Sequence, residues 1–320
     1  MSGSTRKLLI AFGILLVVTI AWNSMERRRT TSRVRSFEEV AIEEVTRITV
    51  SGKGNDVTLE QRAGLWLITA PIEYPANQIL VEDLLSKVDE LTTVNVVSSN
   101  PANHDLYEVG VGTGVLVQLY GGREGNRRMM SMYVGKMTSD FSHTFVRRFT
   151  EDDVHTASGL LSGYFNKTVS AWRDRTIFAL PAASIGQLMV VGSDVDYTLA
   201  MRGSMADAPD VPWVLQTEEG LAEADSSKAM AIVQRVASLN ASGFPEPGDL
   251  VEADWENPVI TIDGRLADGS TIEVRAWEIP DDDSRYYVRK GGDETVFLIY
   301  RSTLDPVLKQ RGDLVVIEEG

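Results

Sequence analysis

Apolar and polar residues alternate in short runs along most of the chain, and glycine, proline, asparagine and aspartate separate the runs. A period of two indicates half-buried β-strands, and the intervening turn residues indicate antiparallel hairpins. One longer stretch, residues 77–91, instead repeats its apolar residues at helical spacing, from Ile79 and Leu80 to Val88 and Leu91. Besides that helix, the first half predicts strands over residues 44–50, 57–61, 64–68, 94–97, 115–120, 129–134 and 143–148.

The second half repeats the same order of elements. Trp66 and Trp213 lie in similar apolar runs 147 residues apart, and Tyr287-Val288-Arg289 matches Phe145-Val146-Arg147 at an offset of 142. A helix over residues 224–239 lies in register with the first helix. The chain therefore predicts an α+β protein with two tandem, diverged copies of an antiparallel-sheet-plus-helix module. The strands predicted in the second copy are 187–191, 197–201, 212–215, 259–262, 272–279, 286–289 and 296–300.

The amino-terminal pattern differs from both copies, because residues 8–22 are almost wholly apolar. With flanking Lys7 and Arg27 reaching the interfaces, this run is long enough for one transmembrane helix. A cleaved signal peptide is the alternative, but the run lacks a good cleavage site and ends at a tryptophan, which favours an uncleaved anchor. The residues predicted to form the anchor are Leu8, Leu15, Leu16, Val17, Val18 and Trp22.

The expected organisation is an anchor over residues 1–25, a basic juxtamembrane stalk over 26–44, a first repeat over 45–183 and a second, acidic repeat over 184–320. Arg27, Arg28 and Arg29 open the stalk. These arginines are either a solvated stalk or a contact for anionic lipid headgroups or an acidic partner. Their position favours a cytoplasmic domain by the positive-inside rule, although long domains can cross the membrane despite such charges.

The net charge of the chain bears on which partners it can bind. The 320 residues contain 31 Lys and Arg against 46 Asp and Glu, a formal net charge of −15. Residues 203–320 alone carry −14. Nucleic acid is therefore not expected as a partner, since phosphate binding requires clustered basic residues. The acidic second half predicts either a soluble surface or a docking face for a basic partner.

Candidate chemistry is scarce, and we predict no catalytic, cofactor-binding or metal-binding residue. The chain has no cysteine, and its three histidines, His104, His143 and His155, do not have the spacing of a metal site. The glycines of residues 110–114 precede a strand and not a helix, so they predict a loop and not a dinucleotide site. Two acidic runs, 151–153 and 281–283, read as solvated turns. Trp66, Trp172, Trp213, Trp255 and Trp277 read as core residues and not as a sugar platform.

Several short motifs of the first copy follow one another in a definite order. Strand, hairpin, tryptophan strand and helix are followed by residues 106–110, Leu-Tyr-Glu-Val-Gly. Then come Tyr133-Val134-Gly135, Phe145-Val146-Arg147 and Trp172-Arg173-Asp174-Arg175. This set resembles a bacterial family, the domain of unknown function 4340, whose glycine strand, tyrosine-x-arginine strand and closing arginine–aspartate motif the last three are similar to. In the second copy, Trp277-Glu278-Ile279 replaces the glycine strand and no arginine–aspartate motif closes the copy.

The resemblance implies a single-span envelope protein, often encoded beside gliding-motility-type ABC transporters. On that basis we expect a non-catalytic accessory or scaffold subunit in the bacterial inner membrane, with its large carboxyl-terminal domain in the periplasm. The expected partners are integral membrane subunits, contacted through the anchor and the extracytoplasmic domain, and membrane lipid. A structural subunit of a different membrane assembly, or an extracytoplasmic glycan- or lipid-binding protein, remains an alternative. A hydrolase has little support from the motifs.

Overall fold

The computed structural model describes residues 35–37, 39–122, 124–202, 213–217, 220–246 and 248–315. The chain divides into two compact units between Asp174 and Arg175. This division comes nine residues before the boundary expected from the sequence, because the segment after it belongs to the second unit. There, the amides of Ile177 and Phe178 both donate to the carbonyl of Leu239, and both side chains are buried.

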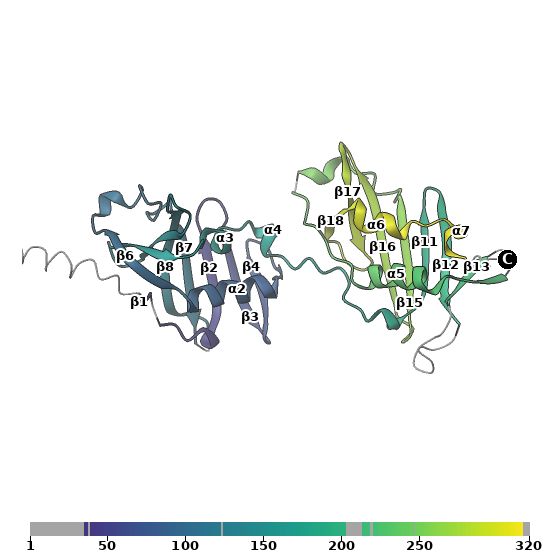
Figure 1. Cartoon of the computed structure of the whole chain (residues 1–320), viewed down its shortest axis with the longest axis horizontal. Coiled ribbons are helices and arrows are strands. Elements are labelled where there is room, and N and C mark those ends of the chain that lie inside the picture. The colour runs from purple at the N-terminus through teal and green to yellow at the C-terminus, as the bar shows by residue number, and fades with distance from the viewer. Residues whose placement is uncertain are drawn as a thin grey trace, which may run out of the picture. The chain divides into compact units, whose positions relative to one another are not determined.

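The first unit is a ten-stranded antiparallel sheet with short helices against one face (Figure 1). Its strands lie in the order β1-β6-β10-β9-β8-β7-β2-β3-β4-β5. Every pairing is antiparallel, as the turn residues between the apolar runs predict. The strands are β1 (Arg35–Ser36), β2 (Val45–Ser51), β3 (Val57–Arg62), β4 (Leu65–Ala70), β5 (Tyr74–Pro75), β6 (Thr92–Ser98), β7 (Val115–Gly121), β8 (Arg127–Met137), β9 (His143–Arg148) and β10 (Val154–Ser158).

The helix α2 (Gln78–Asp89) lies where the apolar spacing predicts it and forms the core of this unit with the sheet. Asn77 is the N-cap residue of this helix, since its Oδ1 accepts a hydrogen bond from the amide of Leu80 at 3.2 Å. The helix buries Val81, Leu84 and Val88 against the inner face of the strands. Two one-turn helices, α3 (Ser162–Phe165) and α4 (Val169–Trp172), complete the core with Phe165 and Trp172.

The second unit is an eight-stranded antiparallel sheet, in the order β14-β13-β12-β11-β15-β16-β17-β18. The helix α5 (Ser226–Ala237) packs on it, capped by Asp225. The short helices α6 (Arg301–Leu304) and α7 (Arg311–Leu314) follow the last strand (Figure 1). The strands are β11 (Ile185–Gly192), β12 (Val195–Met201), β13 (Trp213–Thr217), β14 (Gly220–Glu223), β15 (Ile260–Leu266), β16 (Thr271–Ile279), β17 (Asp282–Lys290) and β18 (Val296–Tyr300).

The two sheets share one connectivity. Strands β5-β4-β3-β2-β7-β8-β9-β10 follow each other in space as do β14-β13-β12-β11-β15-β16-β17-β18. Along the chain, α2 comes directly after β5 and α5 directly after its counterpart β14. The matched contacts include Ala76 N–H donating to Trp66 O and Ala224 N–H donating to Trp213 O, both at 3.0 Å. The tryptophans that the sequence pairs thus occupy equivalent, buried places. Among the residues that the structure describes, strands β1 and β6 have no counterpart in the second sheet.

The closing segments of the two units are also equivalent. Trp172 O accepts the amide of the helix cap Asn77 at 2.7 Å, and Leu314 O accepts the amide of the cap Asp225 at 2.8 Å. Both Trp172 and Leu314 are fully buried. The second unit therefore closes on Leu314 in the place of the first unit's Trp172.

The predicted stalk differs from the structure at its carboxyl-terminal part. Phe37 is buried in the first unit, its amide donates to Leu91 O at 2.9 Å, and the Arg148 guanidinium lies 4.5 Å from its ring centroid. Residues from Arg35 onward therefore belong to the folded unit. The anchor residues, and Arg27, Arg28 and Arg29, lie outside the described residues. None of the helices in the described ranges is long and apolar enough to span a membrane.

Candidate functional site

A loop covers the outer face of each sheet, the face turned away from α2 or α5, and the two loops differ. In the first unit, the loop of residues 99–114 packs Val109 against Tyr133 and Val154. Arg147 on β9 fastens it, because its Nε donates to Val109 O at 3.0 Å and one terminal nitrogen donates to Glu151 O at 2.9 Å. Arg147 is buried, and burial lowers the pKa of its guanidinium.

The close approach of the loop to β8 requires a glycine at position 135. A Cβ at this position would lie 2.3 Å from Tyr107 O and 2.8 Å from Val109 Cγ1, so only glycine lets the loop approach the strand. Residues 106–110, Gly135 and Arg147, which carry the family resemblance, thus meet in one closed cluster. Their role in this unit is to seal the outer face.

The outer face of the second unit is built differently. The pairing of Val134 with Val146 corresponds to that of Ala276 with Val288, so Trp277 stands where the first unit has Gly135. The indole of Trp277 packs in one cluster with Leu250, Ala253 and Trp255 from the loop of residues 244–259. Trp255 from that loop packs on it with ring centroids 5.2 Å apart, and the Arg289 guanidinium lies 4.1 Å from the Trp255 ring centroid.

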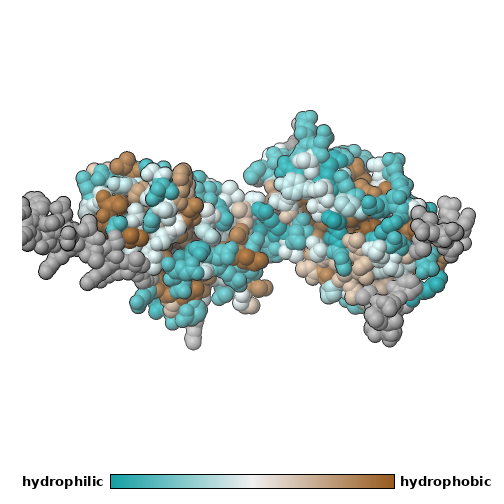
Figure 2. Space-filling model, viewed as in Figure 1, coloured by the Kyte–Doolittle hydropathy of each residue, from teal (hydrophilic) through white to brown (hydrophobic). Residues whose placement is uncertain are grey.

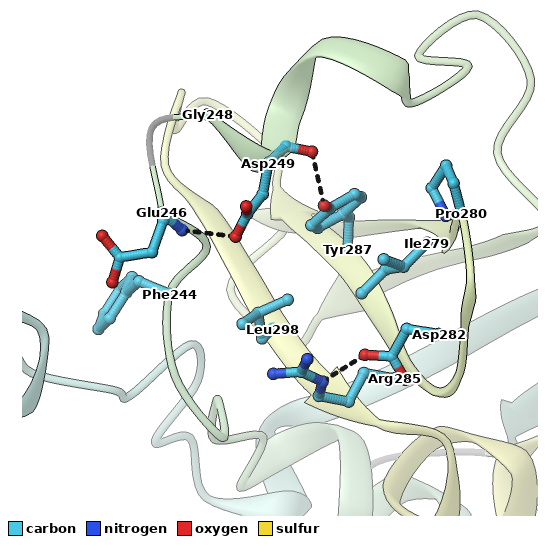
Figure 3. A pocket seen from close by; sticks show the side chains of 10 residues that line it. All are labelled: Phe244, Glu246, Gly248, Asp249, Ile279, Pro280, Asp282, Arg285, Tyr287 and Leu298. Atoms are coloured by element: carbon cyan, nitrogen blue, oxygen red, sulfur yellow. Dashed lines mark hydrogen bonds and ion pairs between the residues drawn. The ribbon is translucent and has the colours of Figure 1, made fainter.

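A pocket of about 560 Å³ lies between the loop, the turn joining β16 to β17, and the outer side of β17 and β18 (Figure 3). Tyr287 and Leu298, directly paired across β17 and β18, form its floor. Its full lining consists of Phe244, Glu246, Gly248, Asp249, Ile279, Pro280, Asp282, Arg285, Tyr287 and Leu298.

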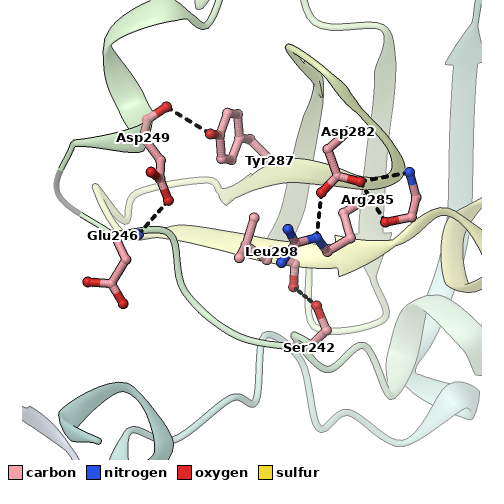
Figure 4. Close-up of polar contacts among 8 residues, drawn as sticks. Ser242, Glu246, Asp249, Asp282, Arg285, Tyr287 and Leu298 are labelled. Carbon is pink, nitrogen blue, oxygen red and sulfur yellow. Dashed lines mark hydrogen bonds and ion pairs between the residues drawn. The ribbon is translucent and has the colours of Figure 1, made fainter.

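The carboxylates of the pocket hold its own walls in place (Figure 4). Asp249 Oδ2 accepts the amide of Glu246 at 3.0 Å, and the Tyr287 hydroxyl donates to Asp249 O at 2.8 Å. Asp282 Oδ1 accepts the amide and hydroxyl of Ser284, while its Oδ2 accepts Arg285 Nε at 2.6 Å. These contacts, the hydrogen bonds from Ser284 first, lower the pKa of Asp282 to about 2, so the carboxylate stays ionised at neutral pH. Burial raises the pKa of Tyr287.

The side chains of the pocket differ in what they leave available to a ligand. The Glu246 carboxylate lies beside Phe244 and has no hydrogen bond or ion pair to the other residues drawn (Figure 3). What faces the space is an apolar floor and the guanidinium of Arg285, whose two terminal nitrogens have no hydrogen-bond partner among the described residues. Such a surface can hold an apolar group and a hydrogen-bond acceptor together.

The structure brings together few of the residues singled out from the sequence. Of the run 281–283, Asp282 opens β17 and is paired with Arg285, so this run is more than a solvated turn. Trp66, Trp172, Trp213 and Trp277 are buried within their units, as expected for core residues. His104 contacts Asp152 O and His143 contacts the Ser142 hydroxyl. Across the described part of the chain, no cluster of three or more His, Asp and Glu could hold a metal ion.

Sequence reasoning missed Arg285 and Tyr287, because a strand pattern does not tell which loop covers each face of a sheet. The one available signal was the tryptophan that replaces the glycine strand in the second copy. That replacement marks a different outer face in the second unit, and the pocket opens on this face beside the replacement.

Comparison with known proteins identifies a family and no close relative. No curated protein and no solved structure matches the chain. The model of one family, described as "Domain of unknown function (DUF4340)", matches residues 66–258, which is more than half of the chain. The match runs from the tryptophan strand of the first unit, through the Arg147 cluster, to the loop that walls the pocket. The chain therefore belongs to the DUF4340 family.

Proposed function

We propose that this protein is a non-catalytic, membrane-anchored accessory subunit that scaffolds a larger membrane complex from the extracytoplasmic side of the bacterial inner membrane. The observation that carries the proposal is the contrast between the two outer faces. The first is sealed by Arg147 and Gly135, whereas the second is open at a pocket whose carboxylates serve its own walls. One unit is thus a closed spacer and the other presents a surface to a partner.

The membrane placement rests on the apolar run of residues 8–22. The family resemblance supports the extracytoplasmic side and a gliding-type ABC transporter as the complex; another large membrane assembly is the competing partner. We infer further that the two units are diverged copies of one module, because the same strand order and the same helix contacts recur in both.

Co-purification tests the accessory role. A tag at the carboxyl terminus, mild detergent and mass spectrometry of native membranes are expected to recover the chain together with integral membrane subunits. An ABC permease and ATPase would identify the transporter, and a different set of subunits would identify another assembly. Recovery of the chain alone, at monomer mass, would falsify the accessory role.

Charge in the apolar run is expected to release the protein from the membrane. Replacing Leu15 and Leu16 with aspartate places two ionised groups at the centre of the predicted span, at a cost of roughly 2.5–3.5 kcal/mol each. The double variant should move from the pellet to the supernatant of a carbonate wash. Replacing the same residues with valine is the control and should leave the protein in the pellet. Retention of the aspartate variant contradicts a single anchor.

A glycan- or lipid-binding role is the alternative, and one observation favours it: the pocket volume of about 560 Å³ falls within the range of small-molecule sites. The buried tryptophans do not contribute a platform to it, since none of them lines the pocket. Thermal stabilisation by a soluble glycan or a short-chain lipid, lost on replacing Leu298 with serine, would support this alternative.

A further inference from the structure

We propose that the pocket of the second unit docks a protruding basic segment of a partner protein, with an apolar side chain on its floor and flanking lysine or arginine side chains at its rim. This inference rests on the proposed accessory function and specifies how the partner is held. Its grounds are the shape of the pocket, the charge around it and the donors of Arg285.

The floor fits one apolar side chain. Tyr287, Leu298 and Ile279 come from neighbouring strands and belong to the cluster that the loop covers. Phe244 and Pro280 add apolar walls from the two sides of the opening (Figure 3). A leucine-sized side chain seated on such a floor is removed from water, and this removal favours binding.

The charge around the pocket selects a basic occupant. Residues 244–259 hold five acids, Glu246, Asp249, Glu252, Asp254 and Glu256, and no lysine or arginine. The opposite wall adds Asp282, with Asp281 and Asp283 on either side of it in the sequence, and Arg285, the basic residue of the lining, is already paired with Asp282. The second unit as a whole carries 26 acidic and 12 basic residues, and its visible surface is largely hydrophilic (Figure 2). This field attracts lysine and arginine and repels an acidic segment.

Arg285 supplies the contact to the backbone of the segment. Arg285 Nε donates to Asp282, whose carboxylate offsets the charge of the guanidinium. The two terminal nitrogens of Arg285 remain directed at the pocket (Figure 4). A backbone carbonyl satisfies these donors without adding charge to the acidic surroundings. An extended segment can therefore place a carbonyl on Arg285 and its next side chain on Leu298.

Three labelled peptides test the proposal on the full chain in detergent. Acetyl-Gly-Arg-Leu-Arg-Gly amide carries both features, its Arg-Ser-Arg analogue lacks the apolar group, and its Glu-Leu-Glu analogue reverses the charge. Fluorescence anisotropy at low salt should show binding of the first, at least tenfold weaker binding of the second and none of the third. Binding of all three alike overturns the proposal.

Matched variants locate the binding. Glu246→Gln, Asp281→Asn and Asp283→Asn together form the rim variant, which removes one charge of the lining and the two charges on either side of Asp282 in the sequence. None of the three makes an ion pair with another described residue, and their loss should weaken the first peptide about tenfold. The control triple variant, Asp194→Asn, Glu223→Gln and Asp313→Asn, removes three exposed charges on the turn after β11, on β14 and on α7, none of which lines the pocket. It should bind as the unaltered chain does. Equal binding by both triple variants overturns the proposal, and unchanged thermal unfolding confirms that both are folded.

Co-purification separates this proposal from the function on which it rests. If partners co-purify with the unaltered chain and are lost from the rim variant, both stand. If the rim variant keeps every partner, the docking site is wrong while the accessory role remains. If the unaltered chain brings down nothing, the accessory role itself fails.

Discussion

Replacing Trp172 with alanine is expected to destabilise the first unit by about 3–5 kcal/mol. The side chain is fully buried at the end of the core and belongs to the same cluster as α2. Its loss leaves a cavity next to the cap of α2, because Trp172 O accepts the amide of Asn77. A unit with a stability of about 5–15 kcal/mol loses a large fraction of it. Calorimetry in mild detergent should show one of two unfolding transitions lowered by roughly 10 °C.

The matched position in the second unit provides the control. Leu314→Ala should lower the unfolding free energy of the second unit by about 2–5 kcal/mol and leave the transition of the first unit unchanged. Leu314 is buried, and its carbonyl accepts the amide of the cap Asp225 as that of Trp172 accepts the amide of Asn77. Trp172→Phe keeps most of the buried volume and should lose less than half as much as the alanine variant. If both transitions move together in the single variants, the two units do not unfold independently.

Replacing Arg147 with alanine is expected to cost about 3 kcal/mol in the first unit and to loosen the loop of residues 99–114. The buried guanidinium donates to four backbone carbonyls, those of Val109, Arg148, Phe149 and Glu151, and lies 4.5 Å from the Tyr133 ring centroid. These carbonyls lose their charged donor in the variant. Hydrogen exchange should accelerate in residues 104–114 and remain slow in α2.

Two comparisons make this result specific to the hydrogen bonds. Arg147→Lys keeps the charge but cannot donate in several directions from one plane, so it should recover only part of the loss. Arg289→Ala, at the equivalent place in the second unit, removes stacking on Trp255 and should cost about 1 kcal/mol. Equal losses in both units would mean that Arg147 acts through packing and not through the carbonyls.

The two arginines also show how one scaffold produces two surfaces. Arg147 and Arg289 occupy the same register on β9 and β17. In the first unit the facing strand has Gly135, so the loop descends and its carbonyls reach the arginine. In the second unit Trp277 packs under the loop, and Arg289 stacks on the Trp255 indole instead. A single large side chain thus accompanies the change from a sealed face to an open one.

The sequence by itself determined most of the local structure. Period-two runs located seven strands in each sheet, and the spacing of Leu80, Leu84 and Val88 located α2. The short strands β1, β5 and β14 were missed, and so was β10, because Val-His-Thr-Ala has no regular alternation and its Val154 and Ala157 are buried by different neighbours. The matched tryptophans indicated two related modules, since equivalent burial requires similar residues at equivalent places.

Only the tertiary structure decided which segments cover which faces. The two units divide after Asp174 because the amides of Ile177 and Phe178 bond to Leu239, about sixty positions further along the chain. Phe37 belongs to the first unit because of similar long-range contacts, with Leu91 and Arg148. The pocket also arises from long-range packing, as Asp249 and Tyr287 meet only when the loop folds over β17. Such contacts depend on the path of the chain in space, which no local periodicity encodes.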